Sequence, residues 1–181
     1  MNHPDYNSPA ELKAFLEENG MAMQKKFGQN FMLNEQAREK IIDALEVNDN
    51  MCVWEIGPGL GCMTDILLRR KCNVSVFEID RGFIKFLHSF FESFEKENTF
   101  RIVEGDCLKT WKKHYDSCNE KPQRLMGNLP YNIAATFIAD TISKGVIPEK
   151  CIFTIQKEVA DRMTAKPGTE NYSAFSVICQ Y

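Results

Sequence analysis

The segment 55–61, with the sequence E-I-G-P-G-L-G, places a carboxylate and three glycines where an apolar run ends. Glycines in such a turn let a ligand approach the backbone and leave the amides of a following helix free to bind it. A dinucleotide fingerprint has the spacing G-x-G-x-x-G, whereas here Gly57 and Gly59 are followed by Gly61, one residue too early. Glu55 beside the turn would also repel a pyrophosphate. The segment therefore favours a ligand without phosphate, although an ordinary tight turn gives the same pattern.

Two further carboxylates follow later apolar runs and could belong to the same site. Glu78 lies about twenty residues beyond the glycine turn, where a carboxylate at a strand end can accept hydrogen bonds from both hydroxyls of a ribose. Asp80 is the weaker candidate, because it can equally cap a helix that begins at Arg81. Asp106 follows the next run and could accept a hydrogen bond from an adenine amino group. The alternatives are a solvated acid at Glu78 and a simple Gly-Asp turn at Asp106.

The segment 127–131, G-N-L-P-Y, follows a fourth apolar run and precedes a helical pattern. An amino group on an aromatic base is a poor nucleophile, because its lone pair is delocalised into the ring. The Asn128 side-chain oxygen and the Leu129 carbonyl, directed outward by the rigid Pro130, can accept its N–H groups and favour a pyramidal nitrogen in the transition state. Tyr131 supplies a face on which a base can stack. The segment predicts chemistry at a base amino group, and a turn with a helix-initiating proline is the alternative.

The spacing acid-x-Gly-x-Gly-x-Gly resembles the first motif of S-adenosylmethionine (SAM) methyltransferases, whose ligand carries no phosphate. Together with four other stretches, it resembles the KsgA-type small-subunit rRNA adenine N6-dimethyltransferases, which are related to the erythromycin-resistance rRNA methyltransferases. The matching stretches are K-F-G-Q-N-F at 26–31, the glycine turn at 55–61, E-I-D at 78–80, G-N-L-P-Y-N at 127–132 and Q-K-E-V-A-D-R at 156–162. The resemblance is specific and covers nearly the whole chain.

That resemblance implies a role for each part of the site. Gln29 and Asn30 would close over the methionine part of SAM, with the main chain of Met32 beside them, where the family usually has leucine. Asn128 would lie between the donor and the target base. The implied cofactor-binding residues are Gln29, Asn30, Met32, Glu55, Gly57, Gly59, Gly61, Glu78, Asp106 and Asn128. The implied catalytic residues are Asn128, Leu129, Pro130 and Tyr131.

By the same resemblance, the protein is an enzyme that transfers methyl groups from SAM to N6 of adenine in small-subunit (16S) rRNA during ribosome biogenesis. Each of two adjacent adenosines would be methylated twice, with S-adenosylhomocysteine as the product. Transfer would be direct and in line, so positioning and the acceptors around Asn128 would supply most of the catalysis. The expected partner is small-subunit rRNA or the pre-assembled small ribosomal subunit. No metal, membrane or obligate protein partner is expected.

Two other functions stay open at this point. Motifs of the type Asn-Pro-Pro-Tyr also serve DNA adenine N6-methyltransferases that flip their target base, but the stretches 26–31 and 156–162 argue against that reading. A non-catalytic ribosome-assembly or transcription factor could instead keep the fold as a binding module. The joint presence of both carboxylates, Asn128 and Tyr131 argues against a loss of catalysis.

The chain alternates apolar runs with helical patterns, and this alternation predicts the scaffold for the motifs. Strands are expected near 52–56, 73–79, 100–103, 125–126 and 151–155, and helices near 63–70, 82–96, 133–143 and 157–165. Such alternation indicates a doubly wound α/β fold whose parallel sheet is buried on both faces. We expect the class I SAM-dependent methyltransferase sheet, Rossmann-like, with strand order 3-2-1-4-5. The polar segment 114–123 is predicted to be a surface loop.

Two amphipathic helices are expected before the first strand. One is capped by Ser8 and ends at Gly20, and the other is capped by Asn34. We expect two parts, an N-terminal helix with a cofactor-covering segment at 1–33 and a SAM-binding catalytic domain at 34–181. The family named above continues with two more strands, a loop that clamps the base and a C-terminal helical RNA-binding domain. The chain is therefore expected to be a truncated form that lacks its last strands and that domain.

The composition is that of a soluble globular protein, with 44% hydrophobic and 26% charged residues among 181. Its formal net charge of -3 excludes a protein that holds nucleic acid by bulk charge alone. The seven cysteines lack zinc-knuckle spacing, so we expect most of them to be reduced core residues. The sequence shows neither a signal peptide nor a membrane span, which predicts a cytoplasmic protein.

Overall fold

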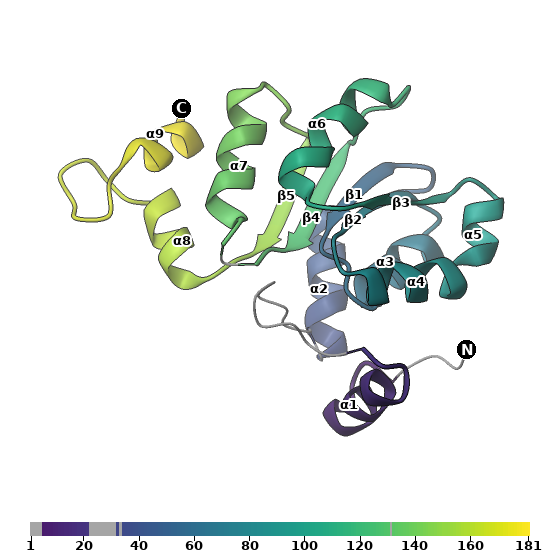
Figure 1. Ribbon diagram of the computed structural model, residues 1–181. Helices are drawn as coiled ribbons and strands as arrows, with labels where there is room; N and C mark the ends of the chain where they lie inside the picture. Colours follow the sequence, from purple (N-terminus) through teal and green to yellow (C-terminus); the bar gives the residue numbers. More distant parts are fainter. Residues whose placement is uncertain (1–4, 22–31, 33, 131) are drawn as a thin grey trace.

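A computed structural model describes residues 5–21, 32, 34–130 and 132–181 (Figure 1). Within these residues, five strands form one parallel sheet in the order β3-β2-β1-β4-β5. The strands are β1 (Cys52–Ile56), β2 (Asn73–Glu78), β3 (Phe100–Glu104), β4 (Arg124–Asn128) and β5 (Lys150–Thr154). The predicted fold class and strand order are confirmed.

The strand register brings the expected site residues to one edge of the sheet. Ile56 at the end of β1 pairs with Phe77 of β2 on one side and with Gly127 of β4 on the other. Asn128 pairs with Thr154 at the end of β5. The loops that carry the glycine turn, the strand-end carboxylates and the Asn-Leu-Pro segment therefore all leave the sheet at its carboxyl edge, where open α/β sheets bind ligands.

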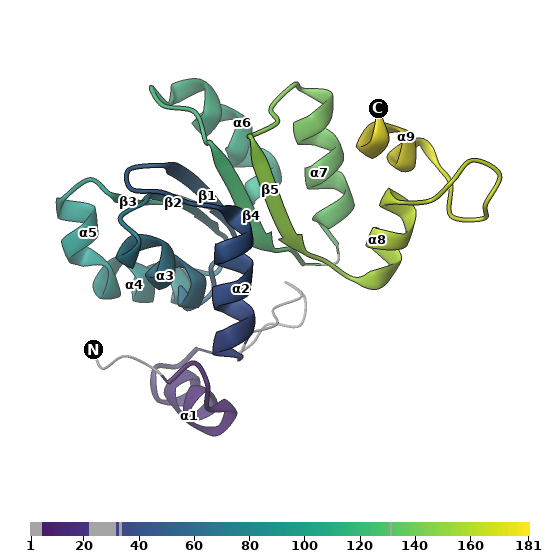
Figure 2. The ribbon, with the colours of Figure 1, turned by 180° about the vertical axis from the view of Figure 1, so that it is seen from behind.

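Helices cover both faces of the sheet (Figures 1 and 2). The first face is covered by α2 (Glu35–Leu45), α3 (Cys62–Arg69) and α4 (Arg81–Phe90), followed by the short α5 (Glu92–Lys96). The second face is covered by α6 (Cys107–Ser117) and α7 (Ala134–Ser143). Side chains that alternate along β1 enter the two cores in turn, Val53 on the first face and Trp54 on the second. This two-sided burial explains why the strands read as continuous apolar runs.

Three helices lie outside these layers. α1 (Pro9–Glu18) begins at Ser8, whose hydroxyl accepts the Glu11 N–H at 3.3 Å, and it packs Leu12 and Leu16 against the core of the first face. α8 (Lys157–Met163) and α9 (Ala174–Gln180) contact each other, and α9 also contacts α7, at the β5 end of the sheet. No helix of the described residues is long and apolar enough to cross a membrane.

Four local predictions need correction. The segment 114–123 was expected to be a loop, but α6 extends into it as far as Ser117, because Cys107 and Trp111 bury one face of an otherwise polar helix, and only residues 118–123 are a loop. The single helix expected at 82–96 is interrupted at Phe91 into α4 and α5. β4 is longer than expected, so Asn128 ends the strand instead of following it. All seven cysteines are free thiols, but most are not core residues, since only Cys72 and Cys107 are buried.

Candidate active site

The glycine turn joins β1 to α3 and packs tightly against its surroundings. Gly57, Gly59 and Gly61 all have positive φ, between 58° and 77°. A Cβ atom on Gly61 would lie 2.6 Å from a ring carbon of Phe91, so this position requires glycine for both its conformation and its space. The Gly57 N–H donates to the carbonyl of Phe77 at 2.9 Å, which fixes the turn beside the end of β2.

Glu78, the last residue of β2, is only 5% exposed and organises the neighbouring backbone. Its carboxylate accepts the N–H groups of Ile79 and Asp80 at 2.8 Å each, and that of Gly59 in the glycine turn at 3.2 Å. Burial raises the pKa of Glu78 to about 7, although these three donors act in the opposite direction. The side chain therefore couples the glycine turn to the end of β2, and a ligand that donates hydrogen bonds to it would favour its charged form.

Glu55 is fully buried at the start of the glycine turn. One oxygen, Oε2, accepts the Thr64 hydroxyl at 2.6 Å, and burial raises the pKa of the carboxyl to about 7. The other oxygen, Oε1, is buried and has no hydrogen-bond partner in the part of the chain that the structure describes. A buried acceptor without a hydrogen-bond donor lowers the stability of the fold.

Asp80 and Asp106 both cap helices. Asp80 accepts the N–H groups of Gly82 and Phe83 at the start of α4, as its alternative reading predicted. Asp106 accepts the Leu108 N–H at 3.1 Å at the start of α6. Asp106 nevertheless lies beside the end of β2, because the N–H of the preceding Gly105 donates to the Glu78 carbonyl at 2.7 Å.

Asn128 ends β4 directly beside the glycine turn. Its carbonyl oxygen is 3.7 Å from the position that a Cβ atom would take on Gly57. Its side-chain Oδ1 accepts the hydroxyl of Thr154 at 2.6 Å, and the Leu129 N–H donates to the Thr154 carbonyl at 3.0 Å. Pro130 follows, and its carbonyl accepts the N–H groups that begin α7. The structure thus brings the three described catalytic candidates to the carboxyl edge, next to the glycine turn.

Three of the predicted site residues, Gln29, Asn30 and Tyr131, lie outside the described residues. Met32 is described, and its carbonyl accepts a hydrogen bond from the buried Arg38 guanidinium of α2 at 2.7 Å. In the described part of the chain, no group of three or more His, Cys, Asp or Glu side chains is arranged to hold a metal ion.

Arg38 and Tyr6 form a contact, called the brace below, that supports the glycine turn. The Tyr6 hydroxyl donates to the Leu60 carbonyl at 2.7 Å, and the Arg38 guanidinium lies 5.7 Å from the centre of the Tyr6 ring. Arg38 also donates to the Asn7 side chain at 2.8 Å. Burial raises the pKa of Tyr6, so its hydroxyl stays a donor at neutral pH. Arg38 thus contacts both Met32 and the N-terminal segment, and that segment contacts the glycine turn through Tyr6.

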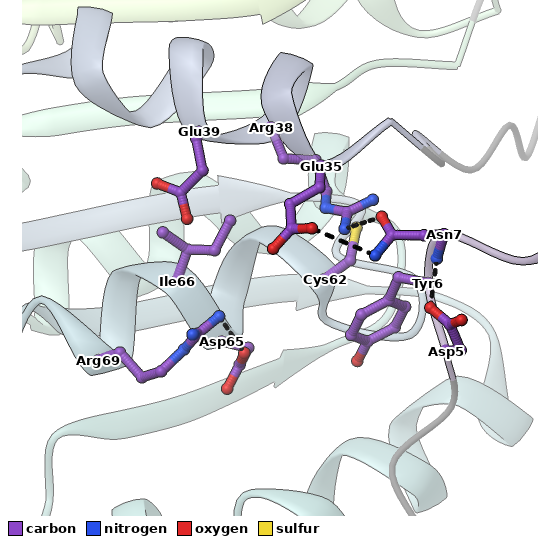
Figure 3. A pocket seen from close by; sticks show the side chains of 10 residues that line it. All are labelled: Asp5, Tyr6, Asn7, Glu35, Arg38, Glu39, Cys62, Asp65, Ile66 and Arg69. Atoms are coloured by element: carbon purple, nitrogen blue, oxygen red, sulfur yellow. Dashed lines mark hydrogen bonds and ion pairs between the residues drawn. The ribbon is translucent and has the colours of Figure 1, made fainter.

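A pocket of about 400 Å³ opens beside this brace, between α2, α3 and residues 5–7 (Figure 3). Its lining residues are Asp5, Tyr6, Asn7, Glu35, Arg38, Glu39, Cys62, Asp65, Ile66 and Arg69. The pocket does not include Glu78 or Asn128. None of the predicted site residues that the structure describes lines it, although Cys62 directly follows the glycine turn.

Sequence reasoning missed four residues of this region. Thr154 was counted only as part of an apolar strand, although a polar residue at the end of such a strand is a signal. Ile79, a large apolar side chain that is 42% exposed beside Glu78, offers an apolar surface at the same edge. Tyr6 and Arg38 carry no signal in the sequence, because their contacts depend on the packing of the N-terminal segment.

Comparisons with known proteins show the family to which the chain belongs. The family described as Ribosomal RNA adenine dimethylase matches residues 20–181. The chain belongs to this family. It is 49% identical to Ribosomal RNA small subunit methyltransferase A of Treponema denticola, over 99% of this chain and 60% of the relative. It is 42% identical to the protein of that name from Borreliella burgdorferi, over 97% of this chain and 60% of the relative. The chain thus spans about 60% of the length of these curated relatives.

Solved structures place the fold in the same group. A dimethyladenosine transferase from Plasmodium falciparum is 30% identical, with a TM-score of 0.65 over 80% of this chain and 50% of its own. The 23S rRNA methyltransferase ErmE superposes with a TM-score of 0.58 at 23% identity, over 77% of this chain and 53% of its own. The dimethylase-family sheet is therefore the scaffold on which the glycine turn, Glu78 and Asn128 are arranged.

Proposed function

We propose that the protein is a SAM-dependent rRNA adenine N6-dimethyltransferase that modifies two adjacent adenosines of small-subunit rRNA in the cytoplasm. The observation that carries this proposal is the position of Asn128 at the end of β4, directly after Gly127, which pairs with Ile56 at the start of the glycine turn. An acceptor for a base amino group and a turn suited to a methyl donor are thus neighbours. Membership in the dimethylase family supports the same conclusion.

The described residues fit SAM as the donor. Gly57 and Gly59 present no side chain to a ligand that approaches the backbone of the turn, and Glu78 can accept hydrogen bonds from ribose hydroxyls. Ile79 adds an exposed apolar surface next to Glu78 that suits an adenine ring, and Asp106 lies at the same edge for the adenine amino group. The unsatisfied Oε1 of Glu55 marks a place where an added donor would be stabilising. When bound, SAM supplies an electrophilic methyl group on a positively charged sulfur.

The protein's own contribution to the reaction is to prepare the target nitrogen. Asn128 Oδ1 and the Leu129 carbonyl accept hydrogen bonds from the N–H groups of the adenine amino group. These bonds draw the lone pair of the amino nitrogen out of conjugation with the ring. Asn128 ends the strand β4, and the next residue, Leu129, is held to the neighbouring strand β5 by its N–H, so both acceptors need little reorganisation when the base arrives. The proton can leave to water after attack, and no strong general base is required. Tyr131 is proposed to stack on the base.

The rRNA substrate is proposed from the family, because the names of the curated relatives refer to the small ribosomal subunit RNA. These relatives are longer than this chain. The test uses the protein at the length at which the organism expresses it, incubated with unmethylated small subunits and labelled SAM. We expect label on two adjacent adenosines, with two methyl groups on each N6. The Asn128→Ala variant is the matched control and should transfer little label.

Other outcomes of this assay would overturn the proposal. Label on duplex DNA and none on rRNA would identify a DNA adenine methyltransferase. SAM binding without transfer to rRNA or DNA would indicate a binding module that retains the fold.

A further inference from the structure

Thr154 is the nearest neighbour of Asn128 across the sheet. The two residues are register partners on the parallel strands β4 and β5, so they lie side by side at the carboxyl edge. Their side chains are joined by a 2.6 Å hydrogen bond in which the Thr154 hydroxyl donates to Asn128 Oδ1. The residue after Asn128 is held to β5 as well, since the Leu129 N–H donates to the Thr154 carbonyl at 3.0 Å.

The Asn128 side chain needs an orienting partner, because the two ends of a carboxamide have nearly the same shape and opposite polarity. Rotation by half a turn about its last torsion would direct the N–H₂ group where the oxygen has to accept a base amino group. A hydroxyl that donates to Oδ1 stabilises the orientation with the oxygen in place. A carboxamide oxygen has two lone pairs, so this bond is compatible with a second one from a substrate amino group.

We propose that Thr154 is a positioning residue that orients the Asn128 carboxamide for methyl transfer. The inference rests on the proposed function and deepens it by assigning a role to a residue of β5. Thr154 supports both acceptors, because its hydroxyl holds the Asn128 oxygen and its carbonyl holds the peptide that leads to the Leu129 carbonyl. Only the first of these contacts depends on the Thr154 side chain. A substitution at Thr154 that lacks the hydroxyl therefore removes the bond to Asn128 and leaves the backbone bond to Leu129 in place.

The experiment compares Thr154→Val with Thr154→Ser in the whole protein, acting on unmethylated small subunits. Valine has nearly the shape of threonine but lacks the hydroxyl, and serine keeps the hydroxyl. For Thr154→Val we expect kcat to fall by roughly tenfold, while KM for SAM and for the small subunit stays within about twofold, because positioning acts on the chemical step. Thr154→Ser should keep at least about half of the wild-type kcat. Thr154→Ala removes the same hydroxyl and is expected to give the same loss of kcat. It replaces the valine variant if valine prevents folding.

A second readout tests whether Thr154 acts through Asn128. In the Asn128→Ala background, Thr154→Val should change the single-turnover rate by less than about twofold, because the group that it orients is gone. The proposal is wrong if Thr154→Val keeps the wild-type kcat, if serine fails to rescue it, or if the valine effect persists undiminished without the Asn128 side chain. A wild-type protein that methylates no adenine would instead overturn the proposed function and this inference with it.

Discussion

The buried Glu78 carboxylate should lower the stability of the ligand-free protein at neutral pH. Burial raises its pKa from the ordinary value of 4.5 to about 7. At about 1.4 kcal/mol for each pKa unit, this difference corresponds to about 3 kcal/mol. Because the pKa is higher in the folded state than in the unfolded state, the stabilising contribution of the protonated group is complete below pH 4.5 and is lost as the pH rises through 7. A neutral residue of the same shape should avoid this loss.

The test is Glu78→Gln, with the free energy of unfolding measured by urea denaturation between pH 4 and pH 8. We expect the variant and the wild type to be similar near pH 4, and the variant to be more stable by up to about 3 kcal/mol at pH 8. The difference between the two proteins isolates Glu78 from other titrating groups. Glu55→Gln should show the same trend, because burial also raises the pKa of Glu55 to about 7. A difference that stays constant from pH 4 to pH 8 would refute the reasoning.

Four further outcomes are expected. Glu78→Ala should weaken SAM binding by about 1 to 3 kcal/mol in calorimetry, and an unchanged affinity with an intact fold would remove Glu78 from the site. SAM affinity of the wild type should rise roughly tenfold between pH 6 and pH 8 as Glu78 ionises, whereas Glu78→Gln should lose most of this rise. Asn128→Ala should slow methyl transfer by roughly 100-fold or more, and a rate within about threefold of wild type would contradict its role. A polypeptide of residues 1–181 should associate through β5, whose outer side has no sheet partner among the described residues, and strictly monomeric light scattering at all concentrations would contradict this.

The α/β fold class was predictable because short, largely apolar runs alternate with helical patterns, and the strand order followed from the resemblance to SAM methyltransferases. α6 was not predicted, since its charged residues hide the spacing of Cys107 and Trp111, and only the packed structure shows that these two are buried. The length of β4 was underestimated for a related reason. Arg124 begins it with a buried guanidinium that donates to the Leu45 carbonyl at 2.8 Å, and a buried arginine is not expected in an apolar strand.

The candidate site was predictable where chemistry follows the end of a strand. Glu78, Asp106 and Asn128 each end or follow a strand, and a parallel sheet brings all such positions to one edge. Contacts that depend on strand register or on packing were beyond sequence reasoning. Thr154 meets Asn128 only because β4 and β5 pair in one particular register. Tyr6 reaches Leu60 across 54 residues of chain with no motif to announce it.

The same features that prepare the site also destabilise the ligand-free protein. Glu55 keeps one buried oxygen without a hydrogen-bond partner among the described residues, and Glu78 keeps a carboxylate at a position where burial disfavours its charge. Each group would be stabilised by a donor that reaches it, so ligand binding and folding stability are linked at this edge of the sheet. Replacing either carboxylate by a neutral side chain should therefore stabilise the fold at neutral pH and weaken the binding of the donor. That opposition distinguishes a site residue from a structural one, because loss of a purely structural residue would lower stability and binding together.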